Sequence, residues 1–136
     1  MKKGFTLLEL IIVIIILGIL AGLGIIGYTG FMERSRNGEA RLILGQLRTA
    51  QLAYFAQHNE YTDILTNLSV SDVPTASATG VCYSTSFYFG YSCATSGTCT
   101  ATRCTSGGKD PDGAAGTYLT LGINGVGGGS GGTYQW

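Results

Sequence analysis

The hydrophobic pattern of this chain begins with one long apolar run close to its N-terminus. Residues 5–26 contain a single charged side chain, Glu9, and every residue from Leu10 to Ile26 is apolar or glycine. A helix rises about 1.5 Å per residue, so a helix over this run can cross a hydrocarbon core of about 30 Å. The run therefore predicts one membrane-spanning helix, with Lys2 and Lys3 on the cytoplasmic side. A secretory signal peptide begins similarly, but no small-residue cleavage site of the A-x-A kind ends this run.

The positions that follow, from Phe31 to His58, predict an amphipathic continuation of the helix. Four apolar residues keep the spacing of one helix face and need a covering layer: Ile43, Leu47, Ala50 and Tyr54. Three arginines recur every seven residues and predict a solvated face: Arg34, Arg41 and Arg48. The helix is expected to end at His58 and Asn59, because asparagine tolerates the left-handed conformation that follows a helix. His58 is interpreted as a cap that complements the helix dipole.

The second half of the chain has the pattern of a small antiparallel sheet. The segment from Thr62 to Gly80 is rich in Ser, Thr and Ala, which predicts a connecting loop with short turns and at most one small helix. Val81–Tyr91 and Gly116–Gly125 are predicted strands, and a short strand is expected around Thr100–Cys104. A sheet of three or four strands, packed across the helix, accounts for these signals.

Three polar or glycine-rich stretches are assigned to the surface. Lys109–Gly113 (KDPDG) predicts a turn, and its two aspartates fall short of the roughly six to eight oxygens that calcium takes. Asn67–Ser69 is an N-x-S sequon, which we interpret as a chance match. The tail from Gly125 to Trp136 is predicted to be flexible until its aromatic end.

Four cysteines predict disulfides: Cys82, Cys93, Cys99 and Cys104. They include no C-x-x-C pair and no neighbouring histidine, so their spacing argues against zinc and for oxidation outside the cytoplasm. About 80 residues remain after the helix, a size at which a lone hydrophobic core is marginal, so two intramolecular bridges are expected. Their spacing leaves all three possible pairings open.

The chemistry needed for catalysis is not apparent in the sequence. His58 is the single histidine and lies at the predicted helix end, the carboxylates are scattered, and no phosphate-binding loop is found. The formal net charge is zero, which gives no basic surplus for nucleic acid or for an anionic membrane surface. We therefore predict that the protein is not an enzyme and has no cofactor or metal.

Glu9 is the residue that the membrane-helix interpretation does not explain. A carboxylate entering lipid without a partner costs about 2–3 kcal/mol, so a cation should pair with it. The nearby cations are Lys2, Lys3 and, if the chain were cut after Gly4, a new amine on Phe5. The sequence KKG followed by FTLLE and a long apolar helix resembles the leader of type IV prepilins.

This resemblance implies a set of processing and assembly residues. Residues 1–4 would be a leader that an inner-membrane prepilin peptidase removes between Gly4 and Phe5, after which the Phe5 amine is methylated. Glu9 would pair with the Phe5 amine of a neighbouring subunit. Residues 5–30 would form the transmembrane and assembly helix, and residues 31–136 the C-terminal half of the helix with a disulfide-stapled head.

The resemblance also implies a fold and a function. The fold is α+β, with a long N-terminal helix and an antiparallel sheet packed on its second half. The protein would be stored in the inner membrane as a prepilin and assembled by membrane machinery with a separate ATPase into an extracellular helical homopolymer. Surface attachment, twitching motility and DNA uptake are the functions this implies. The arginine face could then pair with acidic residues of neighbouring subunits.

The apolar helix contains glycines but lacks the proline that is usual in the family. Gly18 and Gly22 form a G-x-x-x-G pair that allows close helix approach. The family usually has a proline in the second half of this segment, but no proline precedes Pro74 here. We expect any kink or melting between Gly18 and Gly30.

Two alternatives remain open at this point. A type II secretion pseudopilin would share the leader and helix but build a short periplasmic piston, and the cysteines and the Ser/Thr-rich segment favour a surface fibre over it. An electron-conducting filament subunit is suggested by an aromatic series along the helix: Phe5, Tyr28, Phe31, Tyr54, Phe55 and Tyr61. Aromatic residues of a helix usually serve packing, and no haem motif of the C-x-x-C-H kind occurs.

Overall fold

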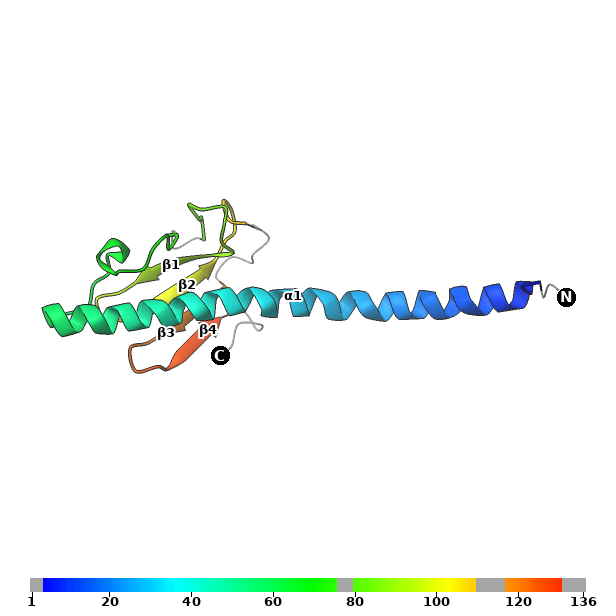
Figure 1. Cartoon of the computed structure of the whole chain (residues 1–136), viewed down its shortest axis with the longest axis horizontal. Helices are drawn as coiled ribbons and strands as arrows, with labels where there is room; N and C mark the ends of the chain where they lie inside the picture. Colours follow the sequence, from blue (N-terminus) through cyan, green and yellow to red (C-terminus); the bar gives the residue numbers. More distant parts are fainter. Residues whose placement is uncertain (1–3, 76–79, 110–116, 131–136) are drawn as a thin grey trace. The chain divides into compact units, whose positions relative to one another are not determined.

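The computed structural model describes residues 4–75, 80–109 and 117–130, without the side chains of residues 25–27, 29 and 30. The chain divides into two compact units, Met1–Glu33 and Arg34–Trp136. The elements follow in the order α1 (Leu7–His58), the 3-10 turn η1 (Leu65–Asn67), β1 (Phe89–Cys93), β2 (Cys99–Arg103), β3 (Tyr118–Leu121) and β4 (Gly127–Ser130). The predicted α+β class is therefore confirmed (Figure 1).

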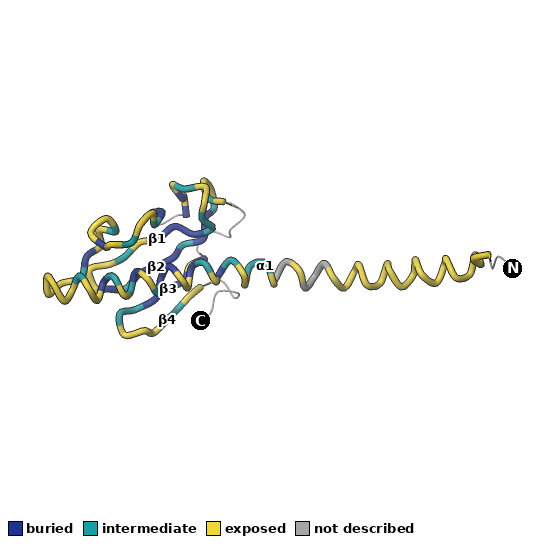
Figure 2. The backbone as a smooth tube through the Cα atoms, viewed as in Figure 1, coloured by how far each residue is buried: buried dark blue, intermediate teal, exposed yellow. Residues whose placement is uncertain are grey.

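The first unit is helical and exposed. Every described side chain from Leu7 to Gly24 is accessible to solvent in the isolated chain (Figure 2). The melting expected between Gly18 and Gly30 is not observed, because the backbone of α1 is α-helical from Leu7 to His58. The glycines lower helix propensity by about 1 kcal/mol each, but isolated glycines do not break the backbone hydrogen-bond ladder as a proline would.

In the second unit, one face of α1 packs on a four-stranded antiparallel sheet of order β1-β2-β3-β4. The predicted stripe is confirmed: Ile43 and Leu47 are buried, and Ala50 and Tyr54 pack against the same core. The residues that α1 and the sheet contribute to this core include Ala40, Leu44, Phe89, Tyr91, Ala101, Leu119 and Leu121. Alternate strand residues face the helix, as the pairing of Tyr91 with Ala101 and of Ala101 with Leu119 requires.

The helix end and the loop that follows agree with the sequence pattern. α1 ends at His58, and Asn59 has a φ of 58°, the left-handed conformation expected there. The small helix predicted in the loop is η1. Gln51 fastens this loop to α1, because its fully buried amide donates to the Thr62 carbonyl and accepts from the Thr62 amide at 3.1 Å.

The predicted strand over Val81–Tyr91 is wrong for most of its length, since β1 begins only at Phe89. The start of this segment pairs instead with residues just after β2. The Cys82 amide donates to the Ser106 carbonyl at 2.9 Å, and Val81 forms an isolated parallel bridge with Ser106. Residues 83–88 form bends and a turn, so the aromatic and β-branched composition predicted strand backbone correctly only at the two ends of this segment.

The flexible tail expected from Gly125 onward is also partly wrong, because Gly127–Ser130 forms the edge strand β4. The strand predicted over Gly116–Gly125 is confirmed only in part, because β3 covers Tyr118–Leu121. A turn follows β3, and Gly125 in this turn has a φ of 81°. Arg48 of α1 donates to the Ile123 carbonyl at 3.0 Å and holds this turn. Glycine has low strand propensity, but its backbone N–H and C=O groups can still pair with the free edge of β3. Tyr134 and Trp136 lie outside the described residues.

Candidate assembly site at the start of the apolar helix

The candidate site lies at the first turn of α1, where a lone carboxylate precedes a long uncharged segment. Glu9 is the single charged residue between Gly4 and Met32. Leu7–Gly24 has a mean hydropathy of 2.8 and is long and apolar enough to cross a membrane. A helix with this composition is stable only where lipid or other apolar helices surround it and exclude water.

Thr6 and Glu9 form a reciprocal cap on this helix. The Thr6 amide and hydroxyl both donate to Glu9 Oε2, at 2.9 and 2.8 Å, and the Glu9 amide donates to Thr6 Oγ1 at 3.3 Å. These bonds satisfy polar groups that the first turn of a helix otherwise leaves without partners. They also fix the carboxylate close to the start of the helix, with Oε1 not engaged by Thr6.

Gly4 and Phe5 precede the helix in backbone without regular secondary structure. Phe5 is 80% exposed, and a side chain added at Gly4 would meet no atom within 4 Å. Exposed, non-helical backbone is the form in which peptidases cleave chains. The bond between the two residues is therefore accessible, while Met1, Lys2 and Lys3 lie outside the described residues.

The site thus contains three residues predicted from the sequence, Gly4, Phe5 and Glu9, within one short segment. A new amine on Phe5 would belong to the residue next to Thr6, which already binds the Glu9 carboxylate. The predicted pair between Glu9 and the Phe5 amine of a second copy involves two chains and stays a prediction. Gly18 and Gly22, the proposed close-approach pair, are both exposed, and a Cβ added at either would meet nothing within 4 Å.

The four cysteines form two disulfides in the second unit. Cys93 pairs with Cys99, the residue directly opposite it in the β1–β2 hairpin, with 4.0 Å between their Cα atoms. Cys82 pairs with Cys104 across a sequence separation of 22 residues. The first bridge closes the hairpin, and the second ties the segment before β1 to the end of β2.

The structure also shows the positions and contacts of other residues that the sequence analysis named. His58 Nδ1 lies 3.2 Å from the Tyr54 carbonyl, and its ring stacks on Tyr54 with centroids 4.1 Å apart. Asn67 of the sequon is exposed at the end of η1. Of the aromatic series, Phe55 and Tyr61 stack with centroids 4.7 Å apart.

The predicted arginine face is only partly solvated. Arg34 and Arg41 are exposed, but Arg48 is half-buried and bound to the β3–β4 turn. Among the residues that the structure describes, no group of three His, Cys, Asp or Glu side chains could hold a metal ion. Asp110 and Asp112 of the predicted turn fall outside this part of the chain.

Sequence reasoning missed four residues with defined roles. Thr6 had a signal, because T-x-x-E before an apolar helix is a capping box. The Glu39 Oε1 atom accepts the Tyr88 amide at 3.0 Å, and Arg103, which is buried, donates from Nη1 to the Tyr88 carbonyl at 3.0 Å. Glu39, Arg103 and Gln51 have no local motif, since their partners are 49, 15 and 11 residues away.

The family model described as the prokaryotic N-terminal methylation motif matches residues 1–25. This match confirms the resemblance that the leader and the apolar helix show. It covers Gly4, Phe5, Thr6 and Glu9, so the whole candidate site lies within the motif.

Known proteins match part of the chain. The chain is 44% identical to type IV major pilin protein PilA of Myxococcus xanthus over 62 residues, which cover 46% of this chain. It is 35% identical to type IV major pilin protein PilE1 of Neisseria gonorrhoeae over 74 residues, or 54% of this chain. It is 46% identical to type IV major fimbrial protein FimA of Dichelobacter nodosus over 50 residues, or 37% of this chain.

The chain spans 28, 45 and 32% of the lengths of these three relatives. The relatives are named as pilins and a fimbrial protein, which agrees with the prediction that the chain is not an enzyme. The chain therefore carries the prokaryotic N-terminal methylation motif and, over about a third to a half of its length, is similar to type IV major pilins.

Proposed function

We propose that this protein is the structural subunit of a type IV pilus. The observation that supports this most directly is Glu9, a carboxylate held by Thr6 in the first turn of α1, in the segment Leu7–Gly24 that is otherwise uncharged and exposed and lies within the methylation motif. A plain membrane anchor has no use for this carboxylate, whereas a filament needs a feature that sets the register between identical apolar helices.

In the proposed pathway, the prepilin is stored in the inner membrane through the apolar helix. A prepilin peptidase cleaves the exposed bond between Gly4 and Phe5, and the new Phe5 amine is methylated. The amine is a cation that can reach the Glu9 carboxylate of a neighbouring copy. Apolar helices leaving the membrane then bury their surface against one another, which supplies the main driving force for polymerisation.

The second unit is the part that faces the exterior in this proposal. Its two disulfides, Cys82–Cys104 and Cys93–Cys99, suit an oxidising compartment. Assembly would require inner-membrane machinery with a separate ATPase, because the sequence has no nucleotide-binding loop.

The experiment that tests this function is the isolation of surface fibres. Fibres sheared from cells that express the gene should appear as long filaments by electron microscopy, and mass spectrometry should identify this chain as their subunit. Deletion of the gene should remove the fibres. A secretion defect without long fibres would instead indicate a pseudopilin and would overturn the pilus assignment.

A further inference from the structure

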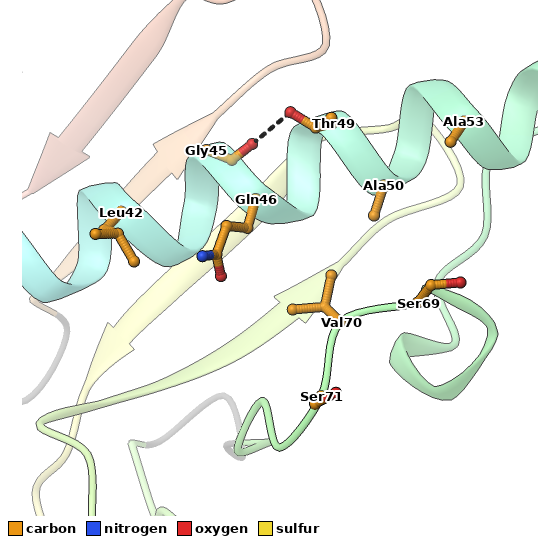
Figure 3. Close-up of a pocket in the computed structure, with 9 residues that line it drawn as sticks. All are labelled: Leu42, Gly45, Gln46, Thr49, Ala50, Ala53, Ser69, Val70 and Ser71. Atoms are coloured by element: carbon orange, nitrogen blue, oxygen red, sulfur yellow. Dashed lines mark hydrogen bonds between the residues drawn. The ribbon is translucent and has the colours of Figure 1, made fainter.

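The second unit contains a small pocket that differs in character from the groove along α1. That groove has a volume of about 730 Å³, and the Thr49 hydroxyl on its helix wall already donates to the Gly45 carbonyl at 3.0 Å (Figure 3). The smaller pocket has a volume of about 320 Å³ and is lined by residues 63–66, Thr75, Tyr91 and Ser92. We call it the η1–β1 pocket. Among the described residues that line it, none belongs to α1.

The polar side chains of the η1–β1 pocket are open to a ligand. They are those of Asp63, Thr66, Thr75 and Ser92, and all four residues are exposed. Within the described part of the chain, no hydrogen bond or ion pair engages the Asp63 carboxylate or the three hydroxyls. A hydroxyl can both donate and accept, whereas a carboxylate only accepts. The pocket therefore offers several donors and acceptors together with one negative charge.

Two apolar residues separate these polar groups along the chain. Ile64 is 54% exposed and Leu65 is half-buried, and both line the pocket. A sugar ring has the matching distribution, because its C–H groups form an apolar face and its hydroxyls lie around the edge. A carboxylate can accept hydrogen bonds from two adjacent hydroxyls, and such charge-assisted bonds are stronger than neutral ones. The lining is therefore suited to a carbohydrate.

Hydrogen bonds hold both walls of the pocket in place. The Tyr91 amide donates to the Pro74 carbonyl at 2.8 Å, and Thr75 forms a parallel bridge with Tyr91 on the outer edge of β1. On the other wall, the Ile64 amide donates to Thr62 Oγ1 at 3.1 Å, and the Thr62 backbone is bound to α1. A preformed site loses less conformational entropy when a ligand binds.

A row of hydroxyl-bearing residues continues from the pocket across the sheet. Ser92 pairs with Thr100 of β2, and Thr100 pairs with Thr120 of β3. These residues lie on the sheet face away from α1, because their neighbours Tyr91 and Ala101 belong to the core that α1 covers. The row carries no charge and is next to the pocket, so a ligand longer than one sugar ring would meet further hydroxyls there.

We propose that the η1–β1 pocket binds one neutral hexose residue of a glycan, with the adjoining sugars along the row of hydroxyls. Asp63 accepts from two hydroxyls of the sugar, and Ile64 packs against its C–H face. The described lining contains no Lys or Arg, which nucleic acids and acidic lipids require, and Asp63 repels anions. This inference goes beyond the proposed function, because sugar binding at this pocket does not depend on fibre assembly.

The first test measures binding with the purified full-length protein and needs no fibres. The protein is kept in a detergent without a sugar headgroup, and saturation-transfer NMR is recorded with glucose, galactose, mannose and N-acetylglucosamine. We expect at least one of these sugars to bind, with an affinity that does not change between about 0.1 M and about 1 M salt, because an uncharged ligand is not screened. Failure of all four sugars to bind, or loss of binding at high salt, would overturn the proposal.

The second test locates the binding site. Asp63→Ala removes the carboxylate, and Glu60→Ala is the matched control at an exposed carboxylate outside the pocket. We expect the dissociation constant of the bound sugar to rise roughly tenfold or more in Asp63→Ala and to stay near the wild-type value in Glu60→Ala. Both variants should keep the two disulfides and the wild-type free energy of unfolding. Equal affinities in the two variants would exclude this pocket.

A third test separates a sugar site from a site that recognises charge alone. Ile64→Ala removes the apolar surface, and Val126→Ala is the control at an exposed apolar residue of the β3–β4 turn. We expect Ile64→Ala to weaken binding roughly threefold or more, because less apolar surface is buried against the sugar, and Val126→Ala to have no effect. Unchanged affinity in Ile64→Ala would contradict the proposal. Fibres whose subunit binds none of the sugars would leave the pilus function in place and remove the pocket assignment.

Discussion

Thr6 and Glu9 bind each other reciprocally at the first turn of α1, through two bonds to Glu9 Oε2 and one to Thr6 Oγ1. The carboxylate therefore has partners within its own chain before any second copy arrives. It is held in one position at the helix start, beside the bond that processing would cleave. In the proposed function, the carboxylate would serve first as a helix cap and then as the acceptor for a neighbouring amine.

Replacing Glu9 tests the second of these roles. Glu9→Val should leave membrane insertion and cleavage intact but strongly reduce or abolish fibres, because the incoming Phe5 amine finds no carboxylate. Mixed with wild-type protein, the variant should reduce fibre number in proportion to its share. The yield of sheared subunit measures both effects, and Glu60→Val, at an exposed acidic residue, is the matched control. Normal fibres from Glu9→Val alone would show that helix packing sets the register.

Replacing Gly4 tests processing. Gly4→Leu should block cleavage, because the peptidase must fit a residue without a side chain between the lysines and the helix. The structure leaves space for this leucine, so the variant should still fold and insert. Mass spectrometry of the N-terminus should show Phe5 as the first residue of the wild type and Met1 in the variant. Gly24→Leu controls for the added leucine, and intact Met1 in wild-type fibres would refute the proposed site.

The two disulfides should differ in their contribution to stability. In the chain-entropy model, loss of the Cys82–Cys104 bridge costs about 3 kcal/mol and loss of the shorter Cys93–Cys99 bridge about 2 kcal/mol. Paired Cys→Ser variants, unfolded by denaturant in detergent, give these values. Peptide mapping of non-reduced protein should find the same two pairs and no free thiol, and any other pairing contradicts the assignment.

Gln51 should be essential for the attachment of the loop to α1. Gln51→Leu removes both hydrogen bonds to Thr62 and leaves a buried backbone amide and carbonyl without partners. Each such group costs on the order of 1–3 kcal/mol. The free energy of unfolding should fall accordingly, whereas Gln57→Leu, at an exposed position of the same helix, should change it little. Similar values for both variants would show that the loop is held in another way.

Glu39 should make stability depend on pH. Burial raises the pKa of its carboxyl above the ordinary value of 4.5, and the amides of Tyr88 and Phe89 only partly oppose this shift. The folded protein therefore binds the proton more tightly than the unfolded chain does. The contribution to stability is greatest below pH 4.5 and is lost as the pH rises through the raised pKa of the folded state.

Glu39→Gln removes this titration and keeps an oxygen that can accept the Tyr88 amide. Its free energy of unfolding should change less than that of the wild type as the pH rises from 4.5, and at neutral pH it should be equal or higher. Denaturant unfolding at a series of pH values measures this, with Glu60→Gln as the control at an exposed carboxylate. An unchanged pH dependence in Glu39→Gln would exclude this carboxyl as its source.

The sequence by itself determined the features that depend on local pattern. The apolar run, the amphipathic stripe through Ile43 and Leu47, and the left-handed Asn59 follow from side-chain spacing and backbone preference. Thr6 belongs to this class as well, because its capping partner is three residues away. The leader motif is likewise local, so the candidate site was predictable almost entirely from residues 1–25.

Tertiary structure alone decided the features that depend on distant partners. Gly127–Ser130 became a strand because β3 offered an open edge, although glycine has little strand propensity. Val81–Phe87 has good strand composition, but Val81 pairs with Ser106 and the Cys82–Cys104 bridge ties the next residue to the end of β2. The binding of Arg48 to Ile123 arises only when α1 and the sheet pack together, and the Cys82–Cys104 bridge joins residues 22 positions apart, so no local pattern indicates either contact.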